Sequence, residues 1–306
     1  MPPRRILATG LTGFSGRHLA PAVAAILPDA ELVPLGCDLT DSGAVAARVR
    51  EVRPDACIHL AAIAAIGVAG SDPGLAWRVN LHGTLALADA LVRHAPGAAL
   101  VHVSSGDAYG HSFATGVAID EGAPLAPMNV YGATKAAADL ALGALAGRSL
   151  HVVRLRPFNQ AGPGQADAFA LPAFARQVAE IARGSRAPVL RVGNLDPERD
   201  FLDVRDVARA YALTLARVHE LPNGSILNLA SGTPRRIGTL LDDLLGLAGI
   251  TPTIEPDPDR MRPSDIPRAI GDASRARALL SWAPQIAWDR TLADVLADWV
   301  QRVGPA

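Results

Sequence analysis

The stretch GLTGFSG, residues 10–16, decides the fold of this chain. It follows a short apolar segment, residues 5–9, and opens a stretch with helical patterning near residues 17–27. Glycines permit a tight strand-to-helix turn, and the helix N-terminus beyond it offers free N–H groups and partial positive charge to a phosphate. The stretch therefore predicts a pyrophosphate-binding turn, with a plain tight turn as the structural alternative. Its expected binding residues are Gly10, Gly13, Phe14, Ser15 and Gly16.

Further apolar segments alternate with helical stretches along the chain. Strands are expected over residues 5–9, 31–35, 56–60, 99–104 and 150–154, and helices near 17–27, 42–53, 74–94 and 131–147. Parallel strands need a helix to return the chain, so this alternation predicts a doubly wound parallel sheet of the Rossmann type. Its ligand should bind beyond the carboxyl ends of the strands.

After residue 156 the sequence becomes rich in proline, glycine and arginine, which predicts a smaller C-terminal substrate-binding lobe. A helix near 204–219 and a strand over 225–229 interrupt this texture. We therefore expect an α/β chain in two parts. Residues 1–156, with 200–230 returning to them, form a dinucleotide-binding domain, and residues 157–199 and 231–306 form the lobe.

Composition excludes several classes of function. The 306 residues are 49% hydrophobic and carry 29 basic against 30 acidic side chains, a net charge of −1. Disorder, nucleic-acid binding and anionic-membrane binding are not expected of such a chain. The first apolar run breaks at Thr9, and no run is long enough to span a membrane, so we expect a soluble cytoplasmic protein. Cys37 and Cys57 are expected to be buried thiols, and no spacing predicts a metal site.

The end of the second expected strand bears on the cofactor. An acid there accepts the 2′-hydroxyl of the adenosine ribose in NADH, whereas an arginine pairs with the 2′-phosphate of NADPH. Asp38 lies 22 residues after Gly16, and no arginine follows before Arg48. NADH or NADPH is therefore expected, with a lean toward NADH. Asp38 has two alternatives, which are to face the adenine or to cap the helix that starts near Asp41.

A serine, a tyrosine and a lysine suggest proton transfer. Tyr131 and Lys135 are four residues apart at the start of an expected helix, which places them on one face. A neighbouring cation favours phenolate, so we expect Lys135 to lower the pKa of Tyr131 toward that of an acid/base catalyst. Ser105 follows an expected strand at the rim where such folds bind ligands. The alternatives are a tyrosine at a helix start, a solvated lysine and a serine that merely ends a strand.

Lys135 is the only lysine beside 28 arginines, which favours the catalytic interpretation. A merely solvated lysine in so arginine-rich a chain would be expected to be arginine. A compact ammonium can bridge ribose hydroxyls and act on the tyrosine, whereas a guanidinium is larger and stays protonated.

With these motifs in place, the chain resembles the extended short-chain dehydrogenase/reductase family of nucleotide-sugar enzymes. The matching stretches are TGLTGFSG, DACIHLAA, NLHGT, VSSGDAYG, YGATK and SWAPQ. Within that family it is most similar to the GDP-6-deoxy-D-mannose reductases, through RLRPFNQAGPGQ, RVGNLDPERDFLDVRDVARAY, RMRPSDIP and IGDASRARALLSWAP. This resemblance implies NAD(P)H-dependent reduction of the C4 keto group of a GDP-4-keto-6-deoxyhexose, giving GDP-D-rhamnose or its talose isomer, by a homodimer.

The resemblance also implies roles for individual residues. Ser105, Tyr131 and Lys135 take the catalytic positions. Beyond the glycine turn, the implied cofactor-binding residues are Asp38, Leu39, Leu60, Ala61, Ala62, Asn80, Tyr131, Lys135 and Pro157. The implied substrate-binding residues are Gly106, Asp107, Asn159, Arg199, Arg262 and Asp265. Arginine pairs bidentately with phosphate, so Arg199 and Arg262 would hold the nucleotide diphosphate, although a surface role is the default in a chain with so many arginines.

Two departures and three rival functions remain. The segment between the second strand and Asp38 is short, as if an edge strand or loop were missing, and Ser281 stands where the family often has glycine. Asp107 occupies the position of the acid in a 4,6-dehydratase, one methylene shorter than the usual glutamate. A 4-epimerase would keep its cofactor tightly bound, and a silent cofactor-binding regulator would be expected to have a broken triad. The intact triad favours the reductase.

Overall fold

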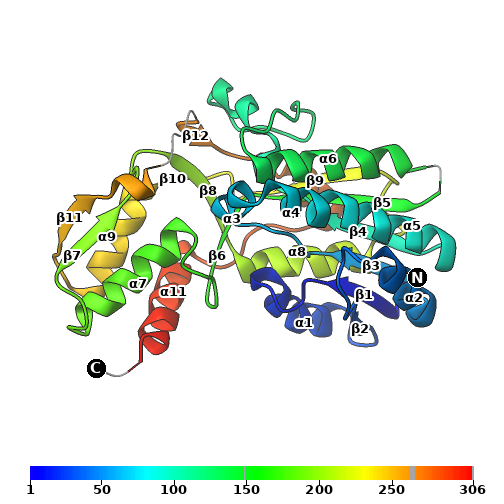
Figure 1. The fold of residues 1–306 in the computed structure, drawn as a ribbon, viewed down its shortest axis with the longest axis horizontal. Coiled ribbons are helices and arrows are strands. Elements are labelled where there is room, and N and C mark those ends of the chain that lie inside the picture. Colours follow the sequence, from blue (N-terminus) through cyan, green and yellow to red (C-terminus); the bar gives the residue numbers. More distant parts are fainter. Residues whose placement is uncertain (148, 262–265, 305–306) are drawn as a thin grey trace.

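A computed structural model describes residues 1–147, 149–261 and 266–304 (Figure 1). Its larger part is built on a six-stranded parallel sheet with the order β2-β1-β3-β4-β5-β9. The α/β class and the Rossmann-type sheet are confirmed. The strands are β1 (Arg5–Thr9), β2 (Glu31–Pro34), β3 (Ala56–His59), β4 (Ala99–Val103), β5 (His151–Pro157) and β9 (Ser225–Leu229).

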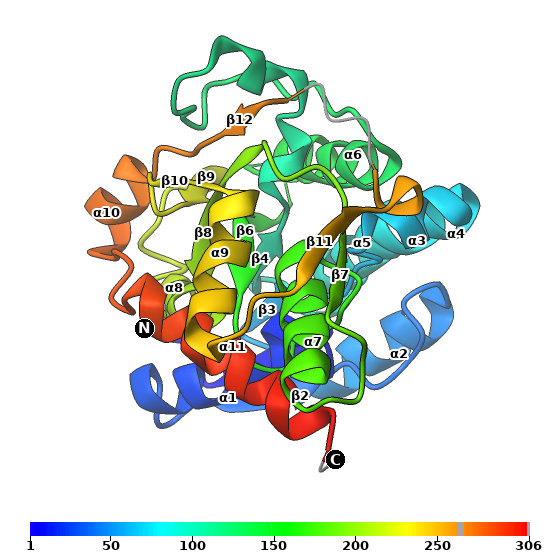
Figure 2. The same cartoon turned by 90° about the vertical axis from the view of Figure 1, so that its left-hand side faces the viewer.

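Helices cover both faces of this sheet (Figures 1 and 2). One face is covered by α1 (Phe14–Ile26) and α8 (Val204–Ala216), and the other by α2 (Ser42–Val52), α5 (Thr84–His94) and α6 (Val130–Leu145). The central strand β4, Ala-Leu-Val-His-Val, is buried at every position because it has a helix layer on each side. The same holds for β3, whereas no residue of the edge strand β2 is fully buried.

The edge of the sheet explains the short segment before Asp38. In the described chain β2 pairs only with β1, so the sheet ends there. Another parallel strand beyond β2 would need its own crossover helix, and α2 begins too soon after β2 to leave room for one.

The expected helix over residues 74–94 is interrupted. It consists of α4 (Pro73–Trp77), the π-helical segment η1 (Arg78–Gly83) and α5. Such wider turns are frequent at functional sites, and this one contains Asn80. Apolar periodicity alone does not reveal it. The short helices α3 (Ile66–Ser71), η2 (Gly106–Ala108), η3 (His111–Thr115) and η4 (Pro258–Arg260) lie in the connections.

The smaller part has its own core at the left of Figure 1. Its helices are α7 (Ala170–Ala182), α9 (Ile237–Ala248) and α11 (Trp288–Arg302). The strand β8 (Glu198–Asp203) pairs with β6 (Asn159–Ala161), β10 (Pro234–Arg236) and β12 (Arg268–Ala269), while β7 (Val189–Val192) pairs with β11 (Thr253–Pro256). The helix α10 (Ser274–Leu280) packs back against β9 and α8.

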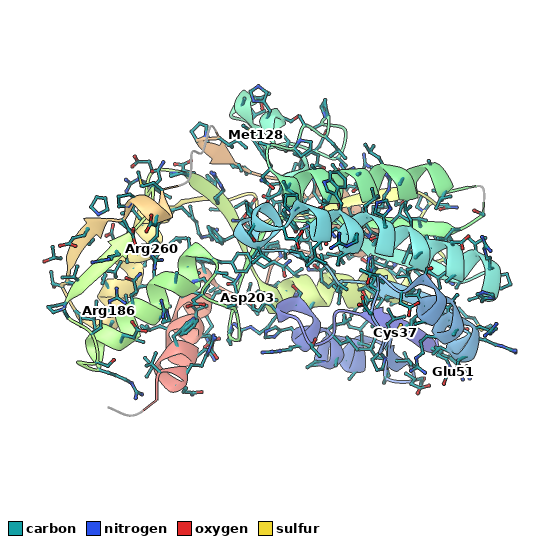
Figure 3. All side chains as sticks on the ribbon, viewed as in Figure 1. Cys37, Glu51, Met128, Arg186, Asp203 and Arg260 are labelled. Carbon is teal, nitrogen blue, oxygen red and sulfur yellow. The ribbon has the colours of Figure 1, made fainter. Side chains whose placement is uncertain are left out.

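Asp203 joins the two parts (Figure 3). Its carboxylate caps α8 by accepting a hydrogen bond from the Arg205 backbone N–H, and it also accepts one from the Thr291 hydroxyl of α11. Arg205 in turn pairs with Asp294 of α11 at 2.7 Å. Because these partners come from both cores, Asp203 fixes the smaller part against the sheet. In the part of the chain that the structure describes, no helix has the length and apolar character to cross a membrane.

Candidate active site

The glycine turn lies at the carboxyl end of β1 and has no room for side chains. Gly10 has a φ of 70°, and a Cβ on it would lie 2.7 Å from the Ala61 nitrogen. A Cβ on Gly16 would lie 2.1 Å from the Gly10 carbonyl oxygen. Gly13 begins α1 without a side-chain cap, so the first amides of the helix, including those of Phe14 and Ser15, face the turn. A dinucleotide pyrophosphate fits such a site, which is a tight turn with helix N–H groups directed into it.

The ends of β2 and β3 flank the glycine turn. Leu60, Ala61 and Ala62 follow β3 and are half-buried, and the Thr9 hydroxyl accepts hydrogen bonds from the first two of their backbone amides, at 3.1 and 3.0 Å. Leu39 is buried against Gly83, whose Cβ position would lie 2.6 Å from the Leu39 Cγ.

Asp38 is exposed in the loop between β2 and α2 and does not cap α2. Its carboxylate accepts hydrogen bonds from the backbone N–H and the hydroxyl of Thr40, both at 2.8 Å, and these bonds lower its pKa. The cap of α2 is Asp41, which accepts from the Ala44 N–H at 2.9 Å. Of the alternatives for Asp38, helix capping is therefore wrong.

Ser105, Tyr131 and Lys135 meet at the carboxyl end of β4. Ser105 begins η2, where its hydroxyl oxygen accepts from the Asp107 N–H at 3.1 Å. Tyr131 lies in the first turn of α6, which Asn129 caps by accepting from the Gly132 N–H at 2.8 Å. The Lys135 ammonium is buried and donates to the carbonyl oxygen of Val103. The four-residue spacing in the helix therefore brings phenol and ammonium to one end of the sheet.

Burial keeps the proton on the Tyr131 phenol. Burial raises the pKa of Tyr131, the negative charge of Asp107 raises it further, and a hydrogen bond with Ser105 lowers it in part. The expectation that Lys135 lowers this pKa is wrong. The Lys135 ammonium donates to Val103 and interacts with Asp139, while the charge that acts on the phenol is that of Asp107. The phenol therefore carries at neutral pH the proton that a donor must have, as an unperturbed tyrosine does, and the shift itself makes it no stronger an acid.

Burial disfavours the positive charge of Lys135. Burial lowers its pKa to about 8, and the carboxylate of Asp139 partly opposes the shift. Asp139 is itself fully buried between Arg154 and Arg156, at 3.1 and 2.8 Å. Burial raises the pKa of Asp139, but the two guanidinium groups outweigh this effect, so it stays ionised. These three side chains hold α6 against β5.

Asn80 supports the site through backbone contacts. Its side-chain oxygen Oδ1 accepts from the Ile63 N–H at 2.8 Å, and its side-chain nitrogen Nδ2 donates to the Thr134 hydroxyl at 2.9 Å. The Thr134 hydroxyl then donates to the backbone oxygen of Tyr131 at 2.8 Å. Asn80 thus ties the loop after β3 to the first turn of α6.

The residues that are expected to bind substrate differ in their burial and in their contacts. Asp107 and Arg199 interact electrostatically; burial raises the pKa of Asp107, and the Arg199 charge opposes this shift. Gly106 packs on the Phe158 ring, where a Cβ would lie at 3.3 Å. Pro157 ends β5 and is buried, whereas Asn159 begins β6 and is exposed. Arg262 and Asp265 lie outside the described residues.

Sequence reasoning did not single out the links between the glycine turn and the smaller part. The Ser15 hydroxyl donates to the side-chain oxygen of Gln160 at 2.8 Å, and the His18 ring lies 3.0 Å from the Pro163 carbonyl oxygen. Gln160 follows Asn159 in the stretch RLRPFNQAGPGQ. That stretch indicated the family resemblance but gave no role to Gln160. Within the described residues, no group of histidine, cysteine and acidic side chains is arranged to hold a metal.

Comparison with known proteins places this geometry in a family. The family model described as GDP-mannose 4,6 dehydratase matches residues 28–295. The GDP-6-deoxy-D-mannose reductase of Pseudomonas aeruginosa is 37% identical to this chain, over 98% of each sequence. The dTDP-L-rhamnose 4-epimerase of Burkholderia thailandensis is 30% identical, over 97% of this chain and 95% of its own.

Solved structures agree with the sequence relatives. RMD from Pseudomonas aeruginosa complexed with NADPH superposes with a TM-score of 0.90 and 34% identity, covering 98% of this chain and 99% of its own. The UDP-glucose 4-epimerase of Thermus thermophilus in complex with NAD superposes with a TM-score of 0.82 and 28% identity, covering 96% and 98%. This chain belongs to the GDP-mannose 4,6-dehydratase family of extended short-chain dehydrogenases/reductases.

Proposed function

We propose that this protein uses NADH or NADPH to reduce the C4 keto group of a GDP-4-keto-6-deoxyhexose, with GDP-D-rhamnose as the expected product. The observation that carries the proposal is the position of Tyr131, whose half-buried phenol is hydrogen-bonded with Ser105 at the carboxyl end of β4. Reduction of a ketone requires an acid at the carbonyl oxygen, and this phenol is that acid. The substrate class follows the similarity to the reductase of Pseudomonas aeruginosa.

Each residue of the site has one task in this reaction. The glycine turn and the amides of Phe14 and Ser15 bind the cofactor pyrophosphate, while Asp38, Leu39 and the residues 60–62 surround its adenosine end. A bound reduced nicotinamide supplies the hydride. Tyr131 gives its proton to the substrate oxygen, and Ser105 hydrogen-bonds to that oxygen. Lys135 orients the nicotinamide ribose.

The smaller part is proposed to bind the nucleotide sugar. Arg199 would pair with the diphosphate, and Asn159 and Gly106 would border the sugar. The same role for Arg262 and Asp265 rests on the family resemblance. The separate apolar core of α7, α9 and α11 supports the division into residues 1–156 with 200–230, and 157–199 with 231–306. The helix α10 and Trp282, which this division places in the lobe, pack instead in the core of the sheet.

A dehydratase activity is the second candidate, and Asp107 is the observation that favours it. Its half-buried carboxyl interacts with Tyr131 and has a raised pKa, as a general acid for water elimination requires. Arg199 stabilises the ionised form of the same carboxyl, which disfavours that role. The reductase therefore remains the primary proposal.

One experiment separates these functions. Purified protein is mixed with GDP-4-keto-6-deoxy-D-mannose, NADH and NADPH absorbance are followed in separate samples, and the sugar is identified by NMR. A reductase oxidises at least one cofactor, and the NMR spectrum distinguishes rhamnose from talose. A dehydratase instead converts GDP-mannose to the keto sugar without added reductant. If neither cofactor is oxidised, the reductase assignment is wrong.

The state of the protein in the cell is also a proposal. We propose a cytoplasmic homodimer, in which the alanine-rich helices α5 and α6, near residues 85–92 and 136–146, pack against a second copy. Leu140 on α6 is 60% exposed, which leaves apolar surface on that helix. Light scattering at micromolar concentration would give twice the chain mass of 31.8 kDa.

A further inference from the structure

A continuous chain of hydrogen bonds runs behind the glycine turn, and His59 is at its centre. His59 is the last residue of β3 and is 1% exposed. Its Nδ1 lies 2.7 Å from the Thr9 hydroxyl oxygen, and its Nε2 lies 2.8 Å from the Thr84 hydroxyl oxygen. Both threonines are buried. The ring therefore spans from β1 to the start of α5.

The neighbouring bonds fix the protonation state of this ring. The Thr9 hydroxyl accepts from the N–H groups of Leu60 and Ala61, which occupies both of its acceptor positions. Its own proton is therefore directed at His59 Nδ1. The Thr84 hydroxyl donates to the Asn80 backbone oxygen at 2.7 Å, so it must accept from His59 Nε2.

This assignment makes His59 a neutral imidazole protonated on Nε2. Burial, and then the charge of Lys135, lower its pKa to about 3, so it stays neutral at any pH at which the protein works. A neutral imidazole supplies one acceptor and one donor on opposite sides of a rigid ring. Both are used here.

The chain ends at the two halves of the candidate active site. On one side it reaches the amides of Leu60 and Ala61, and Ala61 is the residue against which Gly10 packs. On the other side it reaches Asn80, whose side chain continues through Thr134 to the backbone oxygen of Tyr131. His59 thus contributes a rigid ring to a route of hydroxyls, amides and carbonyls from the cofactor turn to the catalytic helix.

We propose that His59 is a positioning residue, which keeps the backbone that binds the cofactor in register with the first turn of α6. This role rests on the proposed function, because it concerns how the cofactor is placed relative to Tyr131. His59 does not touch the reacting atoms. A small displacement of either half separates the groups that must align, and such misplacement lowers turnover by about a hundredfold in well-aligned sites.

Three substitutions of His59 test the two hydrogen bonds of its ring separately. His59→Asn keeps an acceptor near the Nδ1 position, His59→Gln keeps a donor near the Nε2 position, and His59→Leu keeps neither. We expect His59→Leu to weaken NADPH binding about tenfold and to lower kcat about tenfold to a hundredfold. The KM for the keto sugar should change less than twofold, and each amide variant should recover part of the loss.

His102 provides a matched control for burial. It pairs with His59 across β3 and β4 and is equally buried, but within the described residues neither of its ring nitrogens has a hydrogen-bond partner. Replacing an unpaired buried polar group by an apolar one is tolerated. His102→Leu should therefore leave NADPH binding and kcat within about twofold of the wild type.

Isosteric threonine variants keep the test valid if His59→Leu does not fold. Thr9→Val removes the hydroxyl that bonds to His59, Leu60 and Ala61, and Thr84→Val removes the hydroxyl that bonds to His59 and Asn80. Because both variants interrupt the same route, the double variant should cost no more than the larger single effect. Thr214→Val is the control, since the buried Thr214 hydroxyl donates only to Ala210 in its own helix.

The measurements are NADPH fluorescence titration, steady-state kinetics and thermal melting of each full-length variant. Wild-type binding and turnover in His59→Leu would overturn the proposal. So would losses that follow the fall in folded protein alone, or additive effects of Thr9→Val and Thr84→Val. If the wild type binds NADPH but does not reduce the keto sugar, the proposed function fails, while the binding data still decide the role of His59.

Discussion

The ammonium of Lys135 donates a hydrogen bond to the backbone oxygen of Val103, two residues before Ser105. This bond fixes the helix that carries Tyr131 to the strand end that carries Ser105. It also places a cation, with a pKa of about 8, in a fully buried site. The one lysine of the chain therefore connects two of the proposed catalytic residues in addition to carrying charge.

Replacement of this lysine by arginine should separate charge from shape. In Lys135→Arg the positive charge remains, but the planar guanidinium is too large for the buried site next to Val103 and does not donate with the same geometry. We expect the variant to fold and its kcat to fall at least about a hundredfold. Circular dichroism controls for folding. Turnover close to that of the wild type would contradict the role of the ammonium.

The activity should decline as the pH rises through about 8. Burial lowers the pKa of Lys135 from its usual 10.5 to about 8, so the ammonium is present below that pH and lost above it. The kcat/KM for the cofactor, which reports on the free enzyme, should follow this titration. Between about 8 and 10.5 the unfolded chain binds this proton and the folded chain does not, so the contribution of Lys135 to stability rises with pH.

Turnover and melting temperature measured on the same samples test this origin. If the loss of activity at high pH follows a fall in melting temperature, unfolding and not the titration of Lys135 causes the loss. Asp139→Asn removes the carboxylate that raises the pKa of Lys135. A folded sample of this variant should therefore lose activity at a lower pH than the wild type.

Asp107 should prove dispensable for reduction. Its negative charge raises the pKa of Tyr131, so Asp107→Asn should lower that pKa without removing the phenol proton at neutral pH. Reduction should retain kcat within about tenfold, because one general acid contributes about a hundredfold or more and Tyr131 is still present. Any conversion of GDP-mannose without reductant should disappear. Loss of the reductase activity by a hundredfold would instead make Asp107 a proton donor.

Gly16 has no space for a methyl group. In Gly16→Ala the new Cβ would lie 2.1 Å from the Gly10 carbonyl oxygen, so the turn must open. We expect cofactor affinity to fall more than tenfold and stability to fall by about 1–3 kcal/mol. Gly246→Ala is the matched control. It lies in α9 with no heavy atom within 4 Å of the Cβ position, and it should stabilise the protein by about 0.5–1 kcal/mol. Equal melting temperatures for the two variants would contradict this account.

The sequence predicts the bounds of those strands that end at a signal in their own neighbourhood of the chain. β1 and β9 have the predicted bounds, because each is a short apolar run closed by glycine or by a loop. It was not sufficient for the π-helical turn at Asn80, since an added residue in one turn does not alter a helical pattern enough to be seen. The direction of the Tyr131 pKa shift was also wrong, because burial and the approach of Asp107 are tertiary effects.

The sequence also contains a signal for a hydrogen-bonded role of His59. It is a polar residue in the buried strand Ala-Cys-Ile-His, where an unpaired imidazole would be costly, so a partner could have been expected. The identity of that partner could not, because Thr9 and Thr84 are 50 and 25 residues away. Positions in a motif predict which residues matter, whereas the route of hydrogen bonds between them depends on the packed structure.

Asp38 should favour NADH, and salt should weaken the preference. Its exposed carboxylate lies in the loop between β2 and α2, where an adenosine 2′-phosphate would approach it, and the bonds from Thr40 keep it ionised. Like charges repel, but exposed charges are screened over about 10 Å at 0.1 M salt. Asp38→Ser should therefore improve kcat/KM for NADPH relative to NADH severalfold in dilute buffer and less at about 0.5 M sodium chloride. Asp41→Ser, which removes a carboxylate that caps α2, controls for net charge. An unchanged cofactor ratio in Asp38→Ser, or an equal shift in Asp41→Ser, would mean that Asp38 does not read the ribose.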